Sequence, residues 1–140
     1  MIFFDTSAMV PLFGPYHVHS PRSRDAFHAL RPEERACSQH SLAEVFNTLT
    51  KPSFSHGASP TQANEFVRYL KQQFLVVRLE AGDYLQATSV LANLNRGGPL
   101  IHDAIILEAA RKVDADEIYT WNVKHFQQLA PDLADRIRTP

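Results

Sequence analysis

Short apolar runs alternate along this chain with longer segments in which apolar residues recur every three or four positions. The short runs are typical of buried strands, and the longer segments are typical of helices that bury one face. The runs that predict strands are 1–4, 36–38, 75–79 and 117–120. The segments that predict helices are 21–30, 41–50, 60–74, 84–94, 100–113 and 123–129, and another helix is expected to begin near Thr6.

Two of the predicted helices begin at recognisable capping sequences. Ser41-Leu-Ala-Glu44 matches a capping box, in which each of the two side chains accepts a hydrogen bond from the other residue's backbone N–H. Ser59-Pro60-Thr61-Gln62 has the same layout, with proline at the first helical position. Both sequences predict helix N-termini at these points.

The order of the elements indicates the fold class. Strands that alternate with helices form βαβ units, which give a mostly parallel sheet with helices on both faces. We therefore expect a three-layer α/β/α sandwich, built as a single domain over residues 1–140, because no repeat or linker interrupts the chain.

Composition narrows the functional classes. Hydrophobic residues make up 44% of the 140 residues, which is enough for a real core. Acids and bases nearly cancel, at 15 against 14, so binding of nucleic acid through bulk positive charge is not expected. Cys37 is the only cysteine, and no apolar stretch is long enough to span a bilayer. We expect a cytoplasmic protein without a disulfide, a thiolate metal site or a membrane segment.

Polar residues follow two of the predicted strands. Asp5 comes directly after the first strand, and Thr120 and Asn122 lie at and just past the last one. Ligands of open parallel sheets bind beyond the carboxyl ends of the strands. These three residues are therefore candidates for one site.

Each candidate also has a purely structural interpretation. Asp5 would suit the N-cap of the helix near Thr6, and Asn122 the N-cap of the helix at 123–129. Glu44 could serve only the capping box, with Asn47 on the same side of that helix. Asp103 is harder to explain structurally, because an ionised carboxylate in a largely buried helix is costly unless it is paired, hydrogen-bonded or bound to a metal. A structural use stays open for it, since an acid near a helix N-terminus gains from the helix dipole.

The remaining acids are not expected to belong to a site. Two of them precede the last predicted strand, at the opposite edge of the sheet, and the others fit an ordinary solvated surface. These acids are Asp114 and Asp116, and then Glu33, Glu34, Glu65, Asp132 and Asp135.

Four motifs, in order, resemble those of the PIN-domain nucleases, and within them the VapC-type toxins of bacterial toxin–antitoxin pairs. They are Phe-Phe-Asp-Thr-Ser-Ala around Asp5, Ser-Leu-Ala-Glu-Val-Phe-Asn around Glu44, Ile-His-Asp-Ala-Ile-Ile-Leu-Glu-Ala-Ala around Asp103, and Tyr-Thr-Trp-Asn-Val-Lys-His-Phe around Asn122. The resemblance runs from residue 5 to residue 126. It implies a ribonuclease that hydrolyses RNA phosphodiester bonds.

The resemblance also implies roles for individual residues. Asp5, Glu44 and Asp103 would bind the metal, with Asn122 completing the catalytic set. Ser7 and Thr120 match hydroxyl positions that support the site. The family often has Asp where this chain has Asn122, so we expect one strongly held ion and a second that binds with substrate. His102 stands where the family frequently has Tyr.

Oxygen ligands favour Mg²⁺ or Mn²⁺ over zinc. No cysteine or histidine cluster is expected to compete, because the histidines lack a metal-binding spacing such as a helical i, i+4 pair with Glu. These histidines are His17, His19, His28, His40 and His56. The cations that could contact RNA are Lys124, His125, Arg68, Lys71 and Arg96. Trp121 could stack on a base, although packing beneath the site is its default role.

Partners are expected from the resemblance alone. Toxins of this type usually form homodimers, and a cognate antitoxin inserts a segment into their active-site groove. The apolar face of the helix at 63–74, with Phe54 before it, could supply part of that surface, although its default role is to pack in the core.

Two other functions stay open at this point. A phosphoacceptor receiver domain has a similar size and layer order, but it requires an acidic cluster after the first strand, where Asp5 stands alone. A catalytically weak or inactive PIN-like module that binds RNA or a protein is the stronger alternative, because Asn122 replaces a carboxylate.

Overall fold

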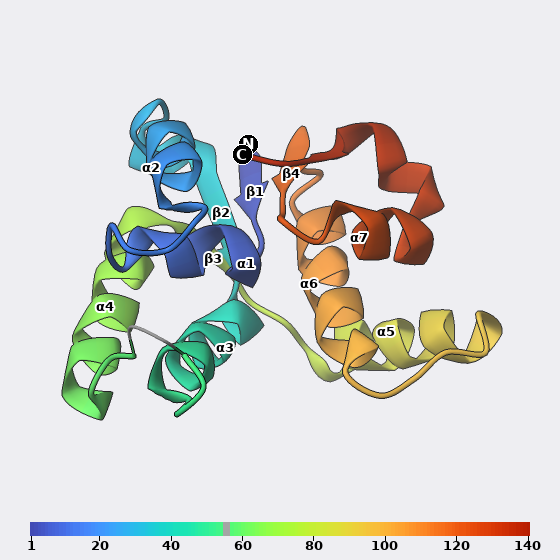
Figure 1. Cartoon of the computed structure of the whole chain (residues 1–140). Helices are drawn as coiled ribbons and strands as arrows, with labels where there is room; N and C mark the ends of the chain where they lie inside the picture. Colours follow the sequence, from blue (N-terminus) through green and yellow to red (C-terminus); the bar gives the residue numbers. More distant parts are fainter. Residues whose placement is uncertain (55–56) are drawn as a thin grey trace.

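The computed structural model describes residues 1–54 and 57–140. Its centre is a five-stranded sheet in which every pair of neighbouring strands is parallel, in the order β3-β2-β1-β4-β5 (Figure 1). The strands are β1 (Ile2–Phe4), β2 (Arg35–Ser38), β3 (Leu75–Val77), β4 (Glu117–Tyr119) and β5 (Ile137–Arg138).

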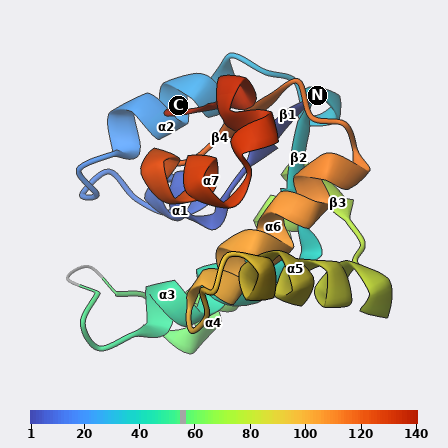
Figure 2. The same cartoon turned by 90° about the vertical axis from the view of Figure 1, so that its right-hand side faces the viewer.

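Helices cover both faces of the sheet, which confirms the α/β/α sandwich. One face carries α1 (Thr6–Met9), α2 (Ser20–His28), α3 (Gln39–Thr50) and α4 (Pro60–Gln73) (Figure 1). The other face carries α5 (Ala81–Asn93), α6 (Leu100–Lys112) and α7 (Val123–Leu129). Helices α5 and α6 pack side by side (Figure 2). Short 3₁₀ helices lie at Val10–Leu12, Pro32–Glu34 and Pro131–Arg136.

The hydrophobic core is divided by the sheet into two parts. Side chains alternate along a strand, so Phe3 joins the α5–α6–α7 side while Phe4 joins the α1–α4 side. Both phenylalanines are fully buried. On the second side, Ala63, Leu70 and Phe74 pack into the core, so most of the apolar stripe of α4 serves the fold rather than an exposed docking surface.

One helix start differs from the prediction. Helix α3 begins at Gln39, and its N-cap is Ser38, whose side chain accepts a hydrogen bond from the backbone N–H of His40 at 3.1 Å. The predicted capping box at Ser41 is therefore wrong: Ser41 is buried inside the first turn of α3. The Ser59–Gln62 box on α4 is confirmed, with both of its hydrogen bonds formed.

The topology places a switch point between β1 and β4. The chain moves outward from β1 through β2 to β3, then returns to the other side of β1 and moves outward again. Ligand sites of open α/β sheets lie at such a point, beyond the carboxyl ends of the two strands. Receiver domains have the strand order 2-1-3-4-5 instead, so the fold excludes that alternative.

The two-residue strand β5 was not predicted, and the predicted loop over 53–59 is only partly described, since residues 55 and 56, including His56, lie outside the described residues. Among the described helices, none combines the length and the apolar character that crossing a membrane requires.

Candidate active site

Asp5 is the centre of a hydrogen-bond network that joins the ends of β1 and β4. Its Oδ2 atom accepts from the Ser7 backbone N–H at 3.1 Å, the Ser7 hydroxyl at 2.6 Å and the Thr120 hydroxyl at 2.9 Å. The Ser7 hydroxyl accepts from the N–H of Trp121 at 2.9 Å, and the Thr120 hydroxyl from the N–H of Asn122 at 3.0 Å. Asp5 is therefore the N-cap of α1, as one interpretation of the sequence predicts, while Oδ1 takes no part in this network.

Ser7 and Thr120 lie where a supporting role requires them. Each hydroxyl donates to Asp5 and accepts from the backbone of the turn after β4, so the two side chains fix the carboxylate relative to that turn. Asp5 and Thr120 are both buried, and the two hydroxyl oxygens lie 3.3 Å apart. The sequence places these groups at neighbouring strand ends, and the structure brings them into contact.

Glu44 projects from the second turn of α3 toward the same strand end. Its Oε2 atom accepts a hydrogen bond from the Thr6 hydroxyl at 2.9 Å. Because α3 begins at Gln39, Glu44 is too far along the helix to cap it. Sequence reasoning did not assign Thr6 to the site, although its position directly after Asp5 was a signal.

Asp103 lies in the first turn of α6, opposite Glu44 across the contact between α3 and α6. Burial raises the pKa of Asp103 to about 7, and the negative charges of Asp5 and Glu44 add to the increase. Burial also raises the pKa of Asp5, against the lowering effect of its hydrogen bonds. Three carboxylates thus share a site in which their full ionisation is costly without a cation.

Asn122 is in the N-cap position of α7, but its side chain makes no capping hydrogen bond. The capping interpretation of this side chain is therefore wrong. Its exposed amide is instead part of the wall of the pocket that contains Asp5, Glu44 and Asp103.

That pocket has a volume of about 560 Å³ and opens at the carboxyl end of the sheet. Glu44, Thr48 and Asp103 also line a second pocket of about 560 Å³, so the two hollows adjoin at these three residues. We call the two together the acidic groove; its lining residues are Asp5, Thr6, Ser7, Val10, His17, Val18, His19, Glu44, Asn47, Thr48, Lys51, Phe54, Pro99, Leu100, His102, Asp103, Trp121, Asn122 and His125.

The donor set of the acids suits a hard cation. Asp5, Glu44 and Asp103 offer carboxylate oxygens, and Asn122 adds an amide oxygen. Oxygen ligands are the ones that Mg²⁺ and Mn²⁺ prefer. Burial and then the neighbouring charges of Asp5 and Glu44 raise the pKa of Asp103, and a cation among the acids would favour its ionised form.

Comparison with known proteins identifies the family. The family model of the PIN domain matches residues 2–130. The chain belongs to the PIN domain family. Among solved structures, the Mycobacterium tuberculosis VapC20 toxin, described as cleaving the sarcin–ricin loop, matches with a TM-score of 0.73 and 19% sequence identity. The match covers 89% of this chain and 92% of that chain, and at this identity it shows the fold. No curated protein matches the sequence.

The predicted RNA-contacting cations of this PIN domain divide into two groups. His125 lines the acidic groove, and Lys124 lies beside it on the exposed side of α7. Arg68 and Lys71 on α4, and Arg96 after α5, are exposed but are not among the described residues that line the groove. Lys51, which sequence reasoning did not select, does line it.

His17 and His19 also line the acidic groove of the PIN domain, which the sequence pattern did not predict. The His19 ring stacks on the Trp121 indole, with 3.7 Å between the ring centroids and 7° between the planes. The Arg22 guanidinium lies 5.5 Å from the same indole ring, and the indole N–H donates to Ser23. Trp121 is thus held by contacts with His19, Arg22 and Ser23, and it also lines the groove.

The prediction about histidine spacing is wrong for His40. Because α3 begins at Gln39, His40 and Glu44 are an i, i+4 pair on one face of this helix. His102, next to Asp103 on α6, completes a group with them. The error came from starting the helix at Ser41, which left His40 outside it.

Several acids that were assigned to the surface do form surface ion pairs. Glu33 and Glu34 pair with Arg31, Asp132 with Arg111, and Asp114 with Arg136. These carboxylates neutralise cations away from the residues that line the acidic groove.

Proposed function

We propose that this PIN domain is a metal-dependent endoribonuclease that hydrolyses RNA phosphodiester bonds, and that it is the toxin of a type II toxin–antitoxin pair. The observation that carries the proposal is the convergence of Asp5, Glu44 and Asp103, from three separate elements, at the switch point of the sheet. The family and the likeness to an RNA-cleaving toxin support the same conclusion.

The cofactor in this proposal is Mg²⁺ or Mn²⁺, held by Asp5, Asp103 and Glu44. When bound, such an ion activates water and neutralises the charge that develops on the phosphate. The protein's own contribution is to hold the ligands: Ser7 and Thr120 fix one oxygen of Asp5, and Thr6 fixes one oxygen of Glu44. Asn122 offers an amide that can bind water or phosphate from the other wall.

The acidic groove gives a path for the substrate. Lys51 and His125 line the part of the groove beyond Glu44 and Asp103, where they can meet phosphates on one side of the scissile bond. Asn47 is exposed at the same wall and can donate a hydrogen bond there. We propose Lys124 as a further phosphate contact next to His125, while Arg68, Lys71 and Arg96 would need RNA that extends past the groove.

The partners in this proposal are an RNA substrate and a cognate antitoxin in the cytoplasm, with the toxin as a homodimer. The likeness to a toxin that cleaves the sarcin–ricin loop suggests structured RNA as the substrate class. A small open reading frame next to the gene would support the antitoxin. Monomers at micromolar concentration in analytical ultracentrifugation would contradict the homodimer.

The deciding experiment compares wild type with Asp103→Asn in Mn²⁺-dependent cleavage of structured RNAs, including a sarcin–ricin loop hairpin. We expect Asp103→Asn to lower the cleavage rate by at least about a hundredfold, since it removes a ligand charge from the metal site. Asp25→Asn, an exposed acid on α2, is the matched control and should keep the wild-type rate.

The alternative function, an inactive module that binds RNA or protein, is favoured by Asn122. It predicts metal-independent binding without cleavage of any RNA in the panel. A cleavage rate that is unchanged in Asp103→Asn would contradict the proposed active site. RNA binding without cleavage, equal in wild type and variant, would establish the alternative instead.

A further inference from the structure

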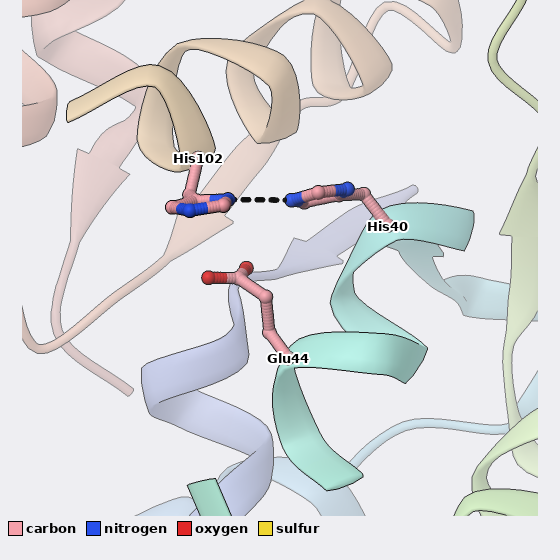
Figure 3. A group of neighbouring side chains, drawn as sticks. All are labelled: His40, Glu44 and His102. Carbon is pink, nitrogen blue, oxygen red and sulfur yellow. Dashed lines mark hydrogen bonds between the residues drawn. The ribbon is translucent and has the colours of Figure 1, made fainter. Parts of the chain in front are cut away.

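A second group of side chains that could hold a metal ion lies beside the carboxylates; Glu44 and His102 line the acidic groove, and His40 contacts His102. His40 and Glu44 are one turn apart on α3, and His102 faces them from the first turn of α6 (Figure 3). His40 Nε2 and His102 Nδ1 lie 2.8 Å apart, and the two ring planes differ by 17°. One nitrogen of each ring and one oxygen of Glu44 all lie within 4.8 Å of one another.

This donor set differs in kind from the oxygen set of the acids. Two imidazole nitrogens and one carboxylate oxygen form a site that zinc occupies in proteins with an open fourth position, whereas Mg²⁺ seldom takes nitrogen ligands. His102 is exposed, so water can reach the remaining position. We propose that His40, His102 and Glu44 bind a zinc-like cation, and that this ion inhibits the nuclease because it takes Glu44 from the oxygen site.

The geometry needs only a small adjustment to hold such an ion. Zinc–nitrogen bonds of about 2.0–2.1 Å in a tetrahedral site separate two ligand nitrogens by about 3.3 Å. The facing nitrogens of His40 and His102 are 2.8 Å apart, so the rings must separate by a few tenths of an ångström. One of the two facing nitrogens carries the hydrogen of their hydrogen bond. Both nitrogens must be unprotonated to bind the ion, so this proton moves to the other nitrogen of the same ring. Both rings then stay neutral.

Glu44 couples this site to the acidic site. Its Oε2 atom is held by Thr6 on α1, and its carboxylate lines both halves of the acidic groove. A cation bound to the two histidines and Glu44 cancels the charge that Glu44 offers to Mg²⁺ beside Asp5 and Asp103. Inhibition of cleavage by zinc is the consequence, and this part alone rests on the proposed function.

Binding is tested without RNA, by titrating Co²⁺ into the protein in the presence of excess Mg²⁺ and recording the visible absorption of the bound ion. We expect wild type to give a saturable band with one Co²⁺ per chain. His40→Ala and His102→Ala should each lower the affinity for Co²⁺ by at least about tenfold. Loss of a residue that only hydrogen-bonds to a metal ligand already costs that much, and these variants lose a ligand itself. His28→Ala, which removes an exposed histidine on α2, is the matched control and should bind Co²⁺ as wild type does.

A second pair of variants separates metal binding from a structural role of the histidine pair. His40→Gln and His102→Gln keep a hydrogen-bonding side chain but remove the imidazole ligand, and circular dichroism reports whether they fold. Folded Gln variants that have lost the Co²⁺ band support the site. A Co²⁺ affinity of the Gln variants equal to that of wild type would overturn it, since the pair would then only hydrogen-bond.

The regulatory part is tested by adding Zn²⁺ to Mg²⁺-supported cleavage, with each variant compared with its own rate without Zn²⁺. We expect zinc to slow wild type at least tenfold and the Gln variants less than twofold. Equal inhibition of all variants would place the inhibitory ion elsewhere and refute the coupling through Glu44. A protein that binds Co²⁺ as expected but cleaves no RNA would leave the metal site standing and refute the proposed function.

Discussion

At the residue scale, Asp5 shows how one side chain can serve both the fold and the site. Its Oδ2 atom caps α1 and accepts the hydroxyls of Ser7 and Thr120. The same residue also lines a pocket shared with Glu44 and Asp103. The structural and the functional interpretation of Asp5, which are alternatives in the sequence, are therefore compatible.

Asp103 makes the metal-free protein sensitive to pH. Its pKa of about 7 in the folded state is higher than the ordinary value of 3.8, so between these values the folded state binds a proton that the unfolded state releases. The free energy of unfolding should therefore fall as pH rises from 4 to 7 and then stay low. Asp5, whose pKa is also raised, contributes in the same direction.

Asp103→Asn should remove the larger part of this loss of stability at higher pH. In EDTA and at pH 8, we expect the free energy of unfolding of the variant to exceed that of wild type by about 2 kcal/mol. This is roughly half of what the full pKa shift of Asp103 corresponds to, because its side chain is partly exposed to solvent. The difference should vanish near pH 4. Urea unfolding at several pH values measures it, with Asp25→Asn as control. A variant less stable than wild type at pH 8 would show that Asp103 is not destabilised in the metal-free site.

At the element scale, α3 positions both metal-binding groups, and its start determines which residues face the groove. Ser38 caps this helix, and the resulting register places His40 and Glu44 on the face toward α1 and α6. In the structure Ser38 takes the capping position, and Ser41 is buried within the first turn instead of standing at the helix start. Such a tertiary effect is outside the reach of sequence pattern.

The sequence could predict the elements that local periodicity determines, but not the contacts that depend on how those elements pack. Periodicity located the major helices and the first four strands, and their order gave the sandwich. The switch point then brought Asp5 and Thr120 together at one edge. The two-residue strand β5 has too little periodicity to detect. The stacking of His19 on Trp121 and the pairing of His40 with His102 join residues 102 and 62 positions apart, which only the packing of elements can show.

Removal of the α3 cap tests the importance of this helix start. Ser38→Ala should lower the free energy of unfolding by about 1 kcal/mol, a typical value for an N-cap, and should also weaken metal binding because the first turn carries His40. Ser59→Ala on α4 is the matched control, with a similar cap and no metal-binding residue in its helix. Urea unfolding and Co²⁺ titration of both variants provide the comparison. Equal loss of Co²⁺ affinity in the two variants would contradict a specific role of the α3 start.

At the scale of the whole molecule, the formal charge of −1 has a particular distribution. Many surface acids are paired with arginines, whereas Asp5, Glu44 and Asp103 converge in one groove. Beyond Glu44 and Asp103, Lys51 is the one lysine or arginine among the described residues that line the groove, with His102 and His125 beside it. RNA phosphates that enter it meet negative charge first, unless a divalent cation is bound.

This distribution predicts an RNA affinity that depends strongly on divalent metal and weakly on monovalent salt. Each phosphate neutralised by a basic side chain contributes a slope of about −0.7 to the dependence of log affinity on log salt for single strands. With Lys51 and one or two neighbouring cations in contact, the slope should lie at about −1.4 to −2.1. Fluorescence anisotropy with a labelled RNA hairpin in Ca²⁺, which takes oxygen ligands, measures the affinity.

Removal of Ca²⁺ by EDTA should weaken RNA binding at least tenfold in wild type, because the groove acids then repel the phosphate. The RNA affinity of Asp103→Asn should fall less on metal removal than that of wild type, since one of the repelling charges is gone. Lys51→Ala should make the salt slope less negative by about 0.7. A slope steeper than about −4 that EDTA leaves unchanged would require a basic surface outside the groove, with Arg68 and Lys71 on α4 the first cations to replace. Metal-dependent binding with a shallow slope instead places the affinity of this PIN domain in its acids and the cation they hold.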